Sequence, residues 1–160
     1  MSYFRLSVRR RVVIAAIALG LAAATAQAAE PEGYKVVDGM AVYFGLLPAE
    51  MIRGHGATHP EATMHGGRPK GIHVYHVTVA LFDRTTSARI TDAEVRARVS
   101  GVGLAGAEKV LESMTIADTV TYGNYFALPG QGPYQIRVEI RRPGATKSAK
   151  VEFTYDHRIR

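Results

Sequence analysis

The sequence contains no cysteine, and this absence excludes several kinds of site. Without thiolate ligands, the chain cannot form a blue-copper centre or a cysteine-ligated structural zinc site. It also has no disulfide framework, so an exported form must fold on its hydrophobic core alone. We expect no lipoprotein anchor either, because such an anchor is attached through cysteine.

The common enzyme signatures are also lacking. The chain has no G-x-S-x-G elbow, no H-E-x-x-H helix and no phosphate loop. The glycine-rich residues 101–106 loosely resemble a phosphate loop, but without its strand-turn-helix context they are better interpreted as a connection between strands. Since no nucleophile is paired with a base, we expect a binding protein and not an enzyme, and a small hydrolase has little support.

No long apolar stripe occurs at helical spacing. Short runs rich in Val, Ile, Tyr and Phe instead alternate with Gly, Pro, Asp and Asn, which is typical of an all-β domain. The expected strands are residues 40–47, 73–83, 94–100, 108–114, 122–128, 134–141 and 150–155. About seven strands at this spacing favour an immunoglobulin-like β-sandwich, with a closed barrel as the alternative. The stretches 31–35 and 157–160 are expected to be loose tails.

Alternation of apolar and polar residues predicts which side chains face the core. The pattern is clearest in residues 134–141 and 150–155, where every second side chain is apolar. The expected core residues are Val77, Val79, Leu81, Tyr134, Ile136, Val138, Ile140, Val151 and Phe153.

The first 28 residues have the features of a cleaved export signal. A basic start precedes the apolar run 12–24 and the A-x-A site Ala26-Gln27-Ala28. The basic residues are Arg5, Arg9, Arg10 and Arg11. The apolar run is too short for a comfortable membrane span. We therefore expect residues 1–28 to be a signal peptide and residues 29–160 to form a single β-sandwich domain in a bacterial periplasm.

Removal of this leader changes the charge of the chain. The full sequence has 20 basic and 14 acidic residues, a formal net charge of +6. The leader holds four of the arginines and no acidic residue, so 16 basic residues face 14 acidic ones in the mature chain. This small excess gives little support to nucleic-acid binding.

Residues 51–65 (MIRGHGATHPEATMH) are rich in metal-binding side chains. They hold three of the six histidines and two of the five methionines. Imidazole and thioether suit copper best, and imidazole also binds iron, zinc and nickel. Gly54, Gly56 and Pro60 disfavour a helix, so the donors are expected on a loop, where sites are often assembled. The alternative is a solvated polar loop that happens to hold histidines.

Further candidate donors follow this segment. His73 and His76 are three residues apart, so on a regular strand they face opposite sides and cannot both reach one site without a bulge. Met114 lies at a strand end, where spacing alone leaves it either a ligand or a core residue. Met40 and Met51 carry the same two alternatives, because methionine fills irregular cores well.

Several stretches of the sequence match the motifs of a known family. Residues 39–43 (GMAVY) resemble its first strand, and residues 59–65 (HPEATMH) resemble its H-x-E-A-x-x-H segment. Met114, followed after six residues by 121–125 (TYGNY), resembles its M-x6-H-Y-G motif, and 132–136 (GPYQI) resembles its next strand. On these motifs the chain resembles the periplasmic metal-binding proteins that accompany high-affinity iron uptake, which are dimeric immunoglobulin-like sandwiches that bind copper.

The resemblance implies a ligand set. The family binds copper through the His and Glu of H-x-E, through the Met, and through the His of H-Y-G. The last of these is replaced here by Thr121, a poor ligand. The missing imidazole then comes from one of three other histidines, or this chain has lost high-affinity binding. The candidate metal ligands are His59, Glu61, Met114, His65, His73 and His76.

Two functions remain open at this stage. The first is a periplasmic protein that binds copper, or alternatively iron, and acts in metal delivery, iron transport or metal tolerance, as a homodimer or with an inner-membrane transporter or assembly partner. A second resemblance, of residues 77–99 to exported sandwiches of the YtkA or FixH-like type, implies the fold without a ligand set. It supports the competing hypothesis of a metal-free interaction module that docks a membrane partner.

Overall fold

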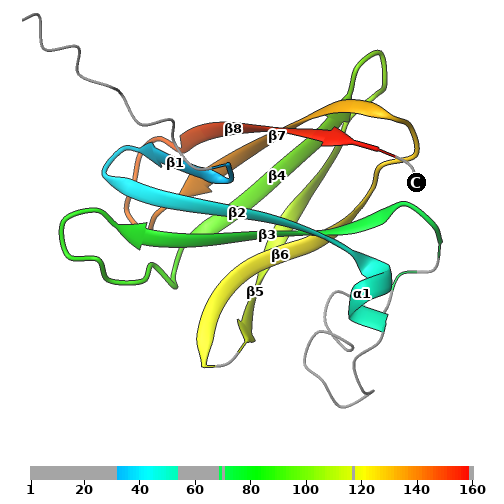
Figure 1. Ribbon diagram of the computed structural model, residues 1–160. Helices are drawn as coiled ribbons and strands as arrows, with labels where there is room; N and C mark the ends of the chain where they lie inside the picture. The colour runs from blue at the N-terminus through cyan, green and yellow to red at the C-terminus, as the bar shows by residue number, and fades with distance from the viewer. Residues whose placement is uncertain (1–31, 54–68, 70, 117, 159–160) are drawn as a thin grey trace, which may run out of the picture.

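The computed structural model describes residues 32–53, 69, 71–116 and 118–158, and almost all of their regular structure is β-strand (Figure 1). The elements in chain order are β1 (Tyr34–Val37), β2 (Met40–Pro48), α1 (Ala49–Arg53), β3 (Val74–Asp83), β4 (Glu94–Gly101), β5 (Ala107–Ile116), β6 (Thr119–Ala127), β7 (Gly132–Arg141) and β8 (Ala149–His157). The prediction of an all-β fold is confirmed, and all seven expected strands are found with small changes at their ends.

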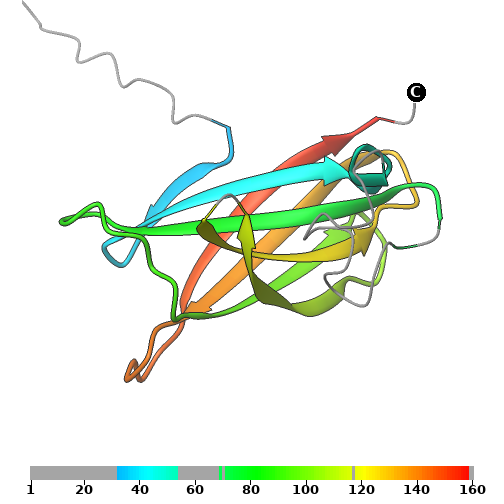
Figure 2. The ribbon, with the colours of Figure 1, turned by 90° about the horizontal axis from the view of Figure 1, so that it is seen from below.

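The strands form one antiparallel sheet in the order β1-β2-β3-β6-β5-β4-β7-β8. Residues 107–111 of β5 pair with β4, and residues 112–116 of the same strand pair with β6. The sheet therefore folds over at β5 into two layers, and Figure 2 shows β7 and β8 running obliquely to β2 and β3. At the open side Phe44 of β2 stacks on Phe153 of β8, with ring centroids 4.8 Å apart. The sheet is thus nearly closed, and its form is intermediate between a two-layer sandwich and a closed barrel.

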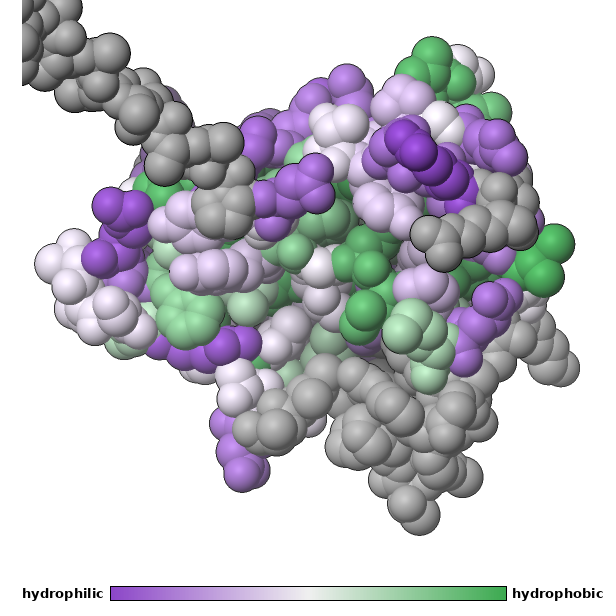
Figure 3. All heavy atoms as spheres, viewed as in Figure 1, coloured by the Kyte–Doolittle hydropathy of each residue, from purple (hydrophilic) through white to green (hydrophobic). Residues whose placement is uncertain are grey.

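The core lies between the two layers. All nine predicted core residues belong to it, and the most exposed of them, Val151, is 7% exposed. Alternation identified them because each strand turns every second side chain toward the opposite layer. At the surface, hydrophobic side chains appear in separate places among hydrophilic ones in the view of Figure 3. Among the described residues, no helix has the length and hydrophobicity needed to cross a membrane.

The prediction of loose tails is wrong for residues 34–35 and for His157, which belong to strands. Tyr34–Val37 forms β1, which pairs with the start of β2 through a tight turn at Asp38 and Gly39. Both turn residues have positive φ, 45° and 74°, as Asp-Gly turns between twisted strands require. At the other end, β8 continues to His157, which is only 1% exposed. Of the glycine-rich residues 101–106, Gly101 ends β4 and residues 102–106 connect β4 to β5, as expected.

Candidate metal centre

His76 is buried on the face of the sheet that points away from the main core. Its neighbours on β3 that belong to the core cluster are Tyr75, Val77, Val79 and Leu81. Alternation along the strand therefore turns His76 to the opposite side, here called the outer face. Its side chain is nevertheless 0% exposed. A polar ring buried outside the main core marks this part of the outer face as a candidate site.

Met114 reaches the same point of the outer face. It lies on β5, is 4% exposed and pairs with Thr121 of β6. A Cβ atom built on Gly123 of β6 would lie 2.5 Å from Met114 Cε and 2.7 Å from His76 Nε2. The methyl group beside the thioether sulfur and the imidazole nitrogen are therefore both within 2.7 Å of one point above Gly123. A residue without a side chain at position 123 leaves the space into which the ends of these two side chains reach.

The border of this site contains a carboxylate and an aromatic ring. Glu112 is exposed and is the register partner of Gly123, so it brings a negative charge to the outer face. The ring of Tyr125 lies 4.7 Å from that of His76, at an interplanar angle of 32°. Tyr125 also packs with Ala49 of α1 and Val74 of β3 in a small apolar cluster. Helix α1 and the start of β3 are thus both anchored beside His76.

Arg89 lies beside Thr121, the register partner of Met114. It forms an isolated bridge with Phe82 of β3, and its guanidinium lies 4.7 Å from the Phe82 ring centroid. Arg89 Nε donates to the carbonyl of Val120 at 2.6 Å, and Nη2 donates to Thr121 Oγ1 at 3.0 Å. Because Thr121 is the register partner of Met114, the fixed positive charge of Arg89 is bound to the residue directly opposite Met114 on the neighbouring strand.

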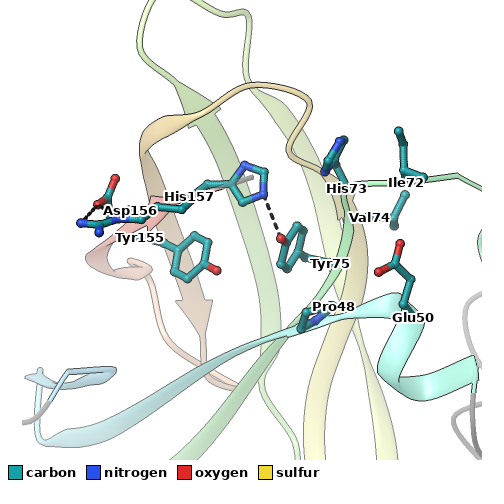
Figure 4. A pocket seen from close by; sticks show the side chains of 10 residues that line it. Pro48, Glu50, Ile72, His73, Val74, Tyr75, Tyr155, Asp156 and His157 are labelled. Atoms are coloured by element: carbon teal, nitrogen blue, oxygen red, sulfur yellow. Dashed lines mark hydrogen bonds and ion pairs between the residues drawn. The ribbon is translucent and has the colours of Figure 1, made fainter. Parts of the chain in front are cut away.

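His73 lies in a separate cleft at the end of the sheet (Figure 4). The cleft has a volume of about 650 Å³, and its lining includes Glu50, Tyr75, Tyr155 and His157. The ring of His73 is 5.8 Å from that of His157. Its backbone has a φ of 59°, just before β3 begins. The structure therefore places His73 and His76 in different surroundings, as their spacing of three indicated.

His157 uses both of its ring nitrogens for hydrogen bonds. The carbonyl of Gly130 accepts a hydrogen bond from Nδ1 at 2.6 Å, so Nε2 is left to accept one from the Tyr75 hydroxyl at 2.8 Å. Burial raises the pKa of Tyr75, and the nearby Tyr155 and Glu50 raise it further. Tyr75 therefore remains a hydrogen-bond donor at neutral pH. We interpret His157 as a structural side chain that fastens β8 to β3.

The structure brings some of the sequence-predicted ligands together and separates others. Met114 lies beside His76, whereas His73 belongs to the cleft. His59, Glu61 and His65 lie outside the described residues.

The two other described methionines do not contribute to this site. Met40 is 3% exposed and belongs to the main core cluster, while Met51 on α1 is 65% exposed. Across the described parts of the chain, no three His, Asp or Glu side chains form a group that could hold a metal ion. A complete ligand set would therefore have to add the thioether of Met114, or donors from residues 54–68, to the His, Asp and Glu side chains of the described residues.

Sequence reasoning missed two residues that shape these sites. The buried position of His157 could have been found, because the alternation of Val151, Phe153 and Tyr155 extends to it. Nothing in the sequence marks Arg89, which follows a turn and reaches Thr121 only in the folded chain.

Comparison with known proteins supports the fold. No protein-family model and no curated protein matches the sequence. Among solved structures, FetP from uropathogenic E. coli strain F11 matches with a TM-score of 0.61 and 13% identity, over 79% of this chain and 93% of FetP. Copper-reconstituted P19 from Campylobacter jejuni matches with a TM-score of 0.56 and 12% identity, over 79% of this chain and 93% of P19. This chain therefore has a fold similar to that of FetP and P19.

A third similar structure is that of a DUF4426 family protein from Pseudomonas aeruginosa PAO1. It matches with a TM-score of 0.54 and 10% identity, over 79% of this chain and 96% of the other. The same fold is thus found in proteins described with bound copper and in one described only by its family.

Proposed function

We propose that this chain is an exported copper-binding protein that holds copper for delivery or tolerance and does not transform a substrate. The observation that carries the proposal is the meeting of Met114 and His76 over Gly123. A thioether and an imidazole form a soft donor pair that suits Cu(I), while imidazole also binds Cu(II). Both side chains are buried, so the pair is shielded from competing water.

The remaining donors in this proposal are His59 and Glu61. Residues 54–68 lie in the sequence between α1 and β3, and both of these elements contribute to the small cluster of Ala49, Val74 and Tyr125 beside His76. An extended chain spans at most about 3.3–3.6 Å per residue, so this segment is long enough for its histidines to reach the outer face.

The comparisons support the proposal through the fold. Variants of FetP and P19 are described as copper-bound, and FetP is described as expressed in the periplasm of E. coli. An export signal at residues 1–28 would deliver this chain to the same compartment. Iron is the alternative metal, because imidazole and carboxylate also serve it.

Titration of residues 29–160 with Cu(I), Cu(II), Fe(II) and Zn(II) tests the proposal. We expect tight Cu(I) binding at one site per chain, lost in Met114→Leu and in His76→Gln. Two matched controls are buried residues of the same types: Met40→Leu in the core, and His157→Gln at the end of β8. Equal copper affinities of the Met114→Leu and Met40→Leu proteins would contradict the proposal. Any copper binding would then have to be assigned to residues 54–68 alone.

A further inference from the structure

We propose that Arg89 sets the preference of this site for Cu(I) over Cu(II). The inference rests on the proposed copper site and concerns the oxidation state that it holds. Arg89 places a fixed positive charge on the outer face, beside Thr121, which is the register partner of Met114.

The guanidinium is held by three contacts, so its position is defined. Its Nε bonds to the Val120 carbonyl, its Nη2 bonds to Thr121 Oγ1, and its plane lies over the Phe82 ring. The residue is only partly exposed, which limits screening of its charge by solvent. Arg89 therefore differs from Arg84, an exposed arginine that donates to the Tyr34 hydroxyl at 3.3 Å.

The spacing of residues along β6 places Arg89 near the donors of the proposed site. Thr121 and Gly123 are two residues apart on β6, which corresponds to roughly 7 Å along the strand. Both lie on the outer face, since side chains two residues apart point the same way. The ends of the Met114 and His76 side chains meet above Gly123. The guanidinium bonds to Thr121 and therefore lies near the ends of Met114 and His76, where its charge acts on a bound ion. It is not itself a ligand, because a guanidinium stays charged and has no acceptor.

A positive charge at this distance penalises a divalent ion more than a monovalent one. The repulsion is proportional to the charge of the ion, so it is about twice as large for Cu(II) as for Cu(I). With partial screening of the charge, this difference in repulsion corresponds to about a tenfold preference of the site for Cu(I) over Cu(II). The carboxylate of Glu112 acts in the opposite direction from the Gly123 side, but it is present equally in all Arg89 variants.

The experiment measures the Cu(II)/Cu(I) midpoint potential of the copper-loaded protein. We expect Arg89→Gln to lower it by about 59 mV, the equivalent of a tenfold change for a one-electron couple. Arg89→Lys keeps the charge and should keep the potential. Arg84→Gln removes an equal charge at the edge of the molecule and should also leave it unchanged. Arg89→Met, which still packs on Phe82, provides a second uncharged variant if Arg89→Gln folds poorly.

The outcomes separate this inference from the proposed function. Failure of the wild-type protein to bind either copper ion would refute the proposed function and the inference with it. Copper binding with no shift in the uncharged Arg89 variants would refute the inference alone. A shift of equal size in Arg84→Gln would also refute it, because the effect would then come from net charge and not from the position of Arg89.

Discussion

Gly123 controls how closely Met114 and His76 can approach each other. Any side chain at this position would enter the space in which their ends meet, since a Cβ would be within 2.7 Å of both. A glycine inside a strand often marks a close approach of this kind. The family motif indicated the glycine, but only the structure explains why a side chain is excluded there.

Replacement of this glycine tests the packing of the site. We expect Gly123→Ala to lower the free energy of unfolding by about 1–3 kcal/mol, the usual cost of overpacking, and to weaken copper binding because both donors must move. Chemical denaturation and copper titration measure the two effects.

Gly130→Ala is the matched control. Its added Cβ would make an ordinary contact, 3.7 Å from the Tyr134 hydroxyl, so stability and copper affinity should stay close to those of the wild type. A Gly123→Ala protein that retained both properties would show that the donors do not meet above this residue.

At the scale of elements, β7 and β8 carry much of the core through strict alternation. Ile136 is 0% exposed and Phe153 is 4% exposed, and the two are register partners. We expect Ile136→Ala and Phe153→Ala each to cost about 2–5 kcal/mol, since the lost contacts leave a cavity. Urea unfolding measures the effect.

The control for this prediction lies in the connection between β4 and β5. Val102 is 80% exposed, so Val102→Ala should change stability by less than about 0.5 kcal/mol. Equal losses from Val102→Ala and Ile136→Ala would contradict the assignment of inward and outward faces.

Most strands and the core could be predicted from the sequence. Period-two patterns identified seven strands and the core, because burial between two layers imposes that period directly. Strand β1 was missed since its four residues alternate too briefly to be recognised, although the Asp38-Gly39 turn signals a hairpin. The position of His76 beside Met114, and of His73 in the separate cleft, could not be predicted from the sequence, because it depends on the pairing of β3 with β6 from a distant part of the chain.

For the whole molecule, export is the property that the sequence predicts most specifically. The basic start, the apolar run and the A-x-A site predict cleavage after Ala28. Mass spectrometry of protein from a periplasmic extract should give a chain that begins at Ala29. Intact protein that still carries Met1 would refute the prediction, and a variant with Ala26 and Ala28 replaced by larger residues should accumulate uncleaved.

The shared strand β5 also bears on how quickly the molecule can fold. Since one half of β5 pairs with β4 and the other half with β6, each layer needs the same strand for its final pairing. The β3–β6 and β4–β7 pairings must in addition close long connections before they contribute stability. Proteins dominated by such distant pairings fold in roughly milliseconds to seconds. We therefore expect a single slow folding phase in which both layers form together, and substitutions in the middle of β5 should slow it most.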